Sequence, residues 1–76
     1  MSGTFEDAFE DLLKGIRAWA EVGNPMPAKK ANEKLAWLFQ QYGIAPDTAA
    51  GLEQQKTAYR RLEEALRSSD RELEQR

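Results

Sequence analysis

Apolar residues recur along the chain at steps of three and four, the spacing that places side chains on one face of an α-helix. The first such run ends before Gly23, the second lies between Pro27 and Gly43, and the third begins near Pro46 and meets no further proline. The chain shows neither an internal repeat nor the turn-bounded alternation of apolar and polar residues typical of a strand. The pattern therefore predicts three helices, over about residues 4–22, 27–42 and 46–74.

The ends of the first two helices carry recognisable signals. Thr4 followed by Asp7 resembles a capping box with aspartate in place of glutamate. Residues 24–27 form a short breaker, because each proline disfavours helical geometry in the residue before it and lacks a backbone N–H. Gly43 is expected to cap the second helix at its C-terminal end.

The third helix is predicted to be the longest. Pro46 or Asp47 is expected to open it, and Gly51 is expected to weaken only its first turn. At 1.5 Å per residue this helix would be roughly 40 Å long, against roughly 25 to 30 Å for the other two. It therefore overhangs its neighbours, and residues 68–76 either fray in water or pack against another chain.

These segments predict an all-α fold in one helical domain spanning residues 1–76. The expected architecture is a small three-helix bundle or an αα-hairpin with a longer C-terminal third helix. The core is modest, because eleven alanines contribute to the hydrophobic content of 41%. Its expected members are Phe5, Phe9, Leu12, Ile16, Trp19, Leu35, Leu38, Phe39, Tyr42, Leu52, Tyr59, Leu62 and Leu66.

The third helix also carries a thin heptad pattern. Gln55 and Ser69 interrupt it at positions where a coiled coil prefers apolar residues. Dimerisation along this seam would complete a small core, so we expect a homodimer through the third helix. The seam consists of Leu52, Tyr59, Leu62, Leu66 and Leu73.

The composition removes most catalytic chemistry. The chain has no cysteine and no histidine, so it lacks thiolate nucleophiles, the commonest general base and the commonest transition-metal ligand. Its glycines are scattered singly and form no phosphate-binding loop. We therefore expect no enzyme activity and no cofactor.

An acidic cluster in the first helix invites a metal interpretation. Carboxylates one turn apart suit hard cations, but negative charge near a helix N-terminus is also ordinary complementation of the helix dipole. We favour the second interpretation and assign neither a metal nor a catalytic role to the cluster, which consists of Glu6, Asp7, Glu10 and Asp11.

Net charge bears on location and partners. The chain carries −2 at pH 7 and no long apolar segment, which favours a soluble, cytoplasmic protein that does not bind membranes and has no general affinity for nucleic acid. Residues 12–42 nevertheless carry a local excess of lysine and arginine.

The second helix, Gly43 and the start of the third helix loosely resemble a helix-turn-helix. The resemblance is poor at Phe39, which is too large for the usual close crossing of the two helices.

Trp37 is the residue hardest to explain by packing. At 100° per residue it falls on the face of the second helix opposite the core stripe, beside Lys30, Lys34 and Gln41. One interpretation is that another element covers the indole. The other is that an exposed tryptophan beside lysine and glutamine side chains anchors a binding partner.

The sequence thus predicts a non-catalytic protein-interaction module that acts as an adaptor, a regulatory subunit or an inhibitor of a larger macromolecule. A small phage or mobile-element antagonist would have such a composition. The predicted partner-binding residues are Trp37, Lys30, Lys34 and Gln41. The alternative is a small helix-turn-helix-like regulator that binds nucleic acid through its second and third helices.

Overall fold

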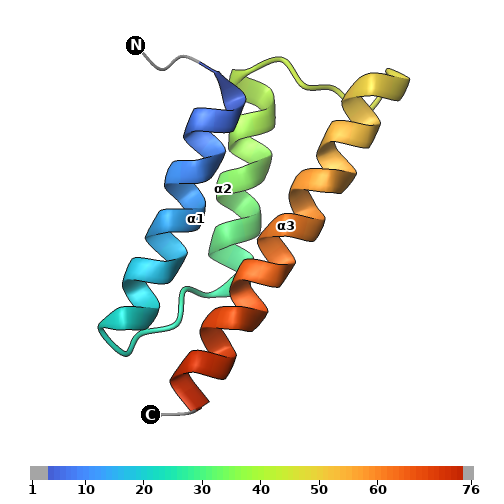
Figure 1. Cartoon of the computed structure of the whole chain (residues 1–76). Helices are drawn as coiled ribbons and strands as arrows, with labels where there is room; N and C mark the ends of the chain where they lie inside the picture. The colour runs from blue at the N-terminus through green and yellow to red at the C-terminus, as the bar shows by residue number, and fades with distance from the viewer. Residues whose placement is uncertain (1–3, 75–76) are drawn as a thin grey trace.

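The computed structural model describes residues 4–74, apart from the side chain of Glu72, and shows three helices packed side by side (Figure 1). Neighbouring helices in the chain run in opposite directions, so the start of the first helix and the end of the third lie at opposite ends of the bundle. The predicted all-α three-helix bundle with a longer third helix is confirmed. The helices are α1 (Phe5–Glu21), α2 (Ala28–Gln41) and α3 (Ala49–Glu74).

The first two helices begin and end at the residues that the sequence marks. Thr4 caps α1, because its side-chain oxygen accepts a hydrogen bond from the Asp7 N–H at 3.3 Å. After α1 and α2 the chain turns through Gly23 and Gly43, which adopt φ values of +85° and +67°. Such left-handed backbone geometry strains residues with a side chain, so glycine suits both turns.

The third helix begins at Ala49, later than the predicted start at Pro46 or Asp47. The reason is a turn in which Thr48, not Asp47, supplies the cap. Its hydroxyl oxygen accepts a hydrogen bond from the Gly51 N–H at 2.9 Å, and its carbonyl accepts one from the Leu52 N–H at 2.9 Å.

The core lies where the three helices meet. Phe5 stacks on both Phe9 and Phe39, with ring centroids 5.6 and 5.5 Å apart, which joins the start of α1 to the end of α2. Eight of the thirteen expected core residues are buried. They are Phe5, Phe9, Leu12, Ile16, Leu35, Leu38, Phe39 and Leu62.

The remaining core expectations were wrong in part. Trp19, Tyr42, Leu52 and Tyr59 keep 38 to 41% of their surface exposed, and Leu66 is half-buried. Both tyrosines pack edge-on against core phenylalanines and so cover the rim of the core. Three alanines and one leucine are buried in the interior in addition to the expected residues. The buried hydrophobic residues that the prediction did not include are Leu13, Ala20, Ala31 and Ala58.

The predicted seam of α3 is divided between the core and the surface. Leu62 is fully buried inside the single chain, so it has no surface left for a second copy, and Leu66 packs against the same core. Gln55 interrupts the seam for a local reason, since its side-chain amide donates to the Ile44 carbonyl at 2.9 Å and ties α3 to the preceding loop. Leu73 is half-buried near the end of α3.

Arg61 links α3 to the acidic start of α1. Its guanidinium donates to Glu10 at 2.5 Å and to Glu6 at 3.4 Å, and it lies 4.9 Å from the centre of the Phe9 ring. The hydrogen bond to Glu10 is the main reason that the pKa of Arg61 is raised. Part of the acidic cluster therefore joins two helices in addition to lying near the dipole of α1. Because the pair is partly exposed, its contribution to stability is small.

α3 continues as a helix to Glu74, so the described part of residues 68–76 is helical, and the last two residues lie outside the described range. Ser69 is buried in this segment, with 4% of its surface exposed. Among the described residues, no helix combines the length and the hydropathy needed to cross a membrane.

Candidate functional site

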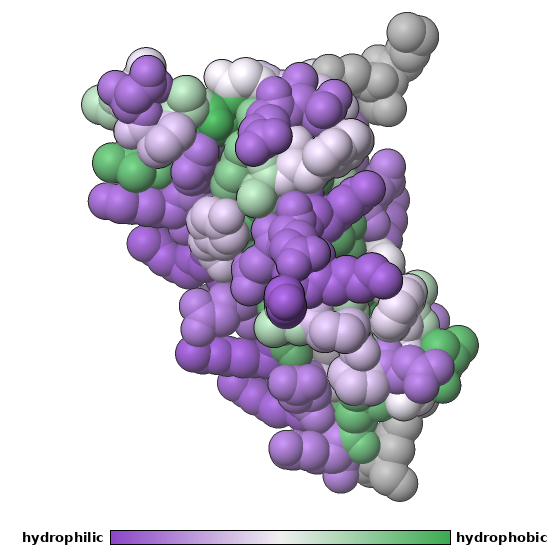
Figure 2. All heavy atoms as spheres, turned by 180° about the vertical axis from the view of Figure 1, so that it is seen from behind, coloured by the Kyte–Doolittle hydropathy of each residue, from purple (hydrophilic) through white to green (hydrophobic). Residues whose placement is uncertain are grey.

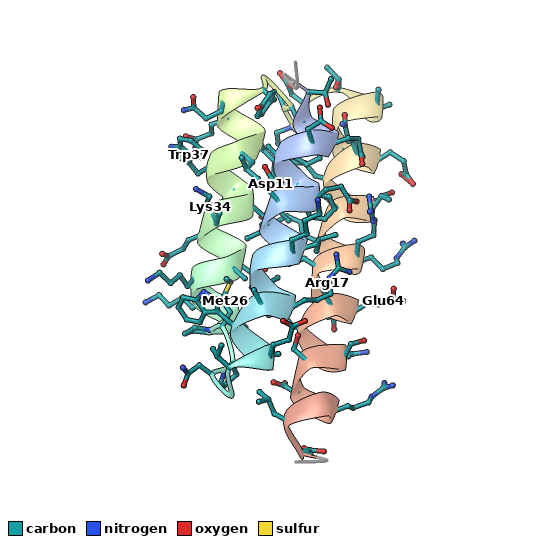
Figure 3. All side chains as sticks on the ribbon, turned by 60° about the vertical axis from the view of Figure 1, so that its left-hand side comes forward. Asp11, Arg17, Met26, Lys34, Trp37 and Glu64 are labelled. Carbon is teal, nitrogen blue, oxygen red and sulfur yellow. The ribbon has the colours of Figure 1, made fainter. Side chains whose placement is uncertain are left out.

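A groove of about 670 Å³ runs along the face between α1 and α2 (Figure 3). α2 contributes one bank, α1 the other, and the loop between them contributes Met26 at one end. The buried side chains Leu12 and Leu38 form the apolar floor. The lining residues are Ala8, Asp11, Leu12, Gly15, Met26, Lys34, Trp37, Leu38, Gln41 and Tyr42.

Trp37 stands on the α2 bank and keeps 50% of its surface exposed. The Lys34 ammonium lies 4.7 Å from the centre of its ring, a distance at which the cation is attracted to the negative ring face. The lysine one turn earlier thus restrains the indole, while half of the ring surface still meets water. An apolar group this large, exposed and restrained is typical of a contact surface.

Two of the four α1 residues that line the groove have no side chain beyond Cβ. Ala8 and Gly15 line the groove with Asp11 between them. Trp19 lies one turn after Gly15 on the same face of α1 and is 41% exposed. The face between the two helices therefore carries a half-exposed tryptophan on each helix.

Three of the four predicted partner-binding residues meet in this groove. Trp37, Lys34 and Gln41 line it together, whereas Lys30 lies one turn before Lys34 on the same face of α2 and is exposed outside it. Within the described residues, Trp37 keeps half of its surface exposed, so its indole is covered only in part.

Sequence reasoning missed most of the α1 bank. The sequence predicts Asp11 only as part of the acidic cluster and Tyr42 as a core residue. The rotation of 100° per residue that places Trp37 opposite the core stripe of α2 also places Ala8, Asp11 and Gly15 on one face of α1. The sequence does not indicate that these two faces lie next to each other.

The two banks carry opposite charges. Lys34 lies on α2 and Asp11 on α1, and neither forms an ion pair with another described residue. Lys30 likewise has no carboxylate partner among the described residues. Among the side chains that line the groove, no hydrogen bond or ion pair joins the two helices. Both charges remain available to a bound molecule.

The other faces of the bundle are more closely tied together. Arg61 bridges α1 and α3 through two carboxylates, and Gln55 fastens α3 to the loop after α2. Figure 2 shows the molecule from behind, on the side of α2, where polar side chains cover most of the surface and hydrophobic ones form small separate groups. The α1–α2 groove combines a half-exposed tryptophan with two charges that have no ion-pair partner among the described residues, and we take it as the candidate binding surface.

The described residues include no group of three or more carboxylates able to hold a metal ion. Comparison of the chain with models of protein families, with curated proteins and with solved structures found no match. The candidate function therefore depends on the groove itself.

Proposed function

We propose that this protein is a non-catalytic protein-interaction module that binds its partner through the α1–α2 groove and acts as an adaptor, a regulatory subunit or an inhibitor of a larger macromolecule in the cytoplasm. The observation that carries the proposal is Trp37, half-exposed on the bank of a groove of about 670 Å³. Tryptophan is among the residues that dominate binding energy at protein interfaces.

The surroundings of Trp37 fit a protein interface better than a small-molecule site. The groove is an open trough between two helices, and its floor is apolar while its banks carry single charges. Protein interfaces combine such an apolar centre with a polar rim. The small side chains Ala8 and Gly15 leave room for an inserted side chain of a partner.

The geometry gives little support to binding of nucleic acid. α2 and α3 lie side by side along the bundle (Figure 1), whereas the two helices of a helix-turn-helix cross at about 90–120°. The first turn of α3 reads Ala49, Ala50, Gly51 and Leu52 and offers no cation for a phosphate. Both features favour a protein partner over nucleic acid.

Capture of the tagged protein from lysate of its native source, with and without nuclease, tests the proposal. We expect a stoichiometric protein partner that survives nuclease and is reduced at least about tenfold by Trp37→Ala, the loss typical of an interface anchor. Lys56→Glu, which changes an exposed charge on α3, is the control and should leave capture unchanged. Retention of nucleic acid, or equal capture by Trp37→Ala and the native chain, would contradict the proposal.

A further inference from the structure

The charges of the α1–α2 face are arranged so that the face is complementary to itself. Asp11 on the α1 bank and Lys34 on the α2 bank lie at similar heights along the two helices (Figure 3). Neither is neutralised by another described residue. A simple acidic or basic partner would match one bank and repel the other.

A two-fold axis running along the groove would place the charged residue on each side of the groove opposite a residue of the other charge in the second copy. It would place α1 of each copy over α2 of the other at the same height, because such a rotation exchanges the two banks. Asp11 of each copy would then face Lys34 of the other, giving two equivalent ion pairs. The alternative axis, across the groove, would instead bring α2 against α2 and set lysine rows against each other.

The shape of the face fits the same arrangement. Trp37 stands on the α2 bank, and Ala8 and Asp11 line the α1 bank. Under the axis along the groove, the indole of each copy would pack over the small side chain Ala8 of the other. A large ring thus meets a small side chain twice, as an isologous interface requires.

From the self-complementary charge and shape we propose that a second copy of this chain occupies the α1–α2 groove, forming a two-fold dimer in which Asp11 pairs with Lys34 of the second copy. This inference rests on the proposed function, since it uses the same docking surface, and the two copies must separate before the groove can bind a larger partner. It replaces the third-helix seam, in which Leu62 is buried within one chain. The contact surface is small, so the dimer is weak, with a dissociation constant between about 1 µM and 1 mM.

Sedimentation equilibrium of charge variants tests the dimer. The native chain should rise from 8.6 kDa toward twice that mass as its concentration increases to about 1 mM. Asp11→Lys and Lys34→Glu each place like charges opposite one another at both contacts, so each variant alone should dimerise at least about tenfold more weakly. In an equimolar mixture the two lysines of one variant face the two carboxylates of the other. The mixture should therefore associate about as tightly as the native chain.

Trp37→Ala should weaken the dimer as well, whereas Lys56→Glu on α3 should leave it unchanged. Circular dichroism of every variant checks that the helices remain folded. A native chain that stays monomeric at about 1 mM, or a mixture no tighter than its two components, would overturn the dimer. If a monomeric native chain still captures another protein in a Trp37-dependent way, the dimer fails and the proposed function stands.

Discussion

Replacing Leu62 with alanine is expected to lower the free energy of unfolding by about 2–4 kcal/mol. Leu62 has no exposed surface and belongs to the central cluster between α1, α2 and α3. Shortening it removes buried methyl groups and leaves a cavity that the packed helices fill only in part. For a domain of this size the loss is a large share of the total stability.

Leu52→Ala is the matched control, because Leu52 lies on the same heptad frame of α3 but keeps 39% of its surface exposed. We expect it to cost less than about 1 kcal/mol. Urea unfolding followed by circular dichroism at low micromolar concentration measures both variants as single chains. Equal losses at the two positions would show that Leu62 is not in the core of the single chain, and would reinstate it as a residue of an intermolecular seam.

Gly51→Ala is expected to destabilise the protein by about 1–3 kcal/mol, opposite in sign to the effect of helix propensity. Gly51 is buried in the first turn of α3, where a Cβ atom would overlap with the backbone carbonyl oxygen of Ala45 and lie 2.7 Å from the Thr48 hydroxyl oxygen. That hydroxyl also caps the helix. Relieving the overlap therefore requires the turn before α3 to move.

Gly15→Ala in α1 provides the comparison, because a Cβ atom there would meet only the end of the Met26 side chain at 4.0 Å. Propensity then dominates, and stability should rise by up to about 1 kcal/mol. Thermal unfolding of the two variants beside the native chain measures the difference. If Gly51→Ala is stabilising too, the turn from Ala45 to Thr48 does not pack against α3 as described.

The pattern of apolar residues was sufficient to predict three helices, because each has a stripe of period 3.6 and a proline or glycine at its boundary. It could not predict which stripe residues reach the centre. Tyr59 and Leu52 share a frame with Leu62, yet only Leu62 is fully buried. The alanines Ala31 and Ala58 are buried, whereas Tyr59 remains 38% exposed. Such choices depend on the packing of three helices together.

The candidate site could likewise be predicted from the sequence only in part. The positions of the apolar residues around the second helix were enough to place Trp37 opposite the core stripe, and the structure shows this residue half-exposed. The α1 bank was not predictable, since the sequence does not specify which face of α1 adjoins α2. Gly51 is a third example. From the sequence, a glycine inside a helix is expected to lower helix stability, whereas in the structure a Cβ atom at this position would overlap with the Ala45 carbonyl oxygen.

Site-specific photo-crosslinking in cells of the native source tests most directly whether the α1–α2 groove contacts protein. A benzophenone amino acid at Gln41, an exposed groove residue, leaves Trp37 intact, and the same probe at the exposed Gln54 on α3 is the control. We predict discrete protein adducts from Gln41, including a product of two copies of this chain, and none of these from Gln54. Adducts to nucleic acid, or equal labelling from both positions, would contradict protein contact at this groove.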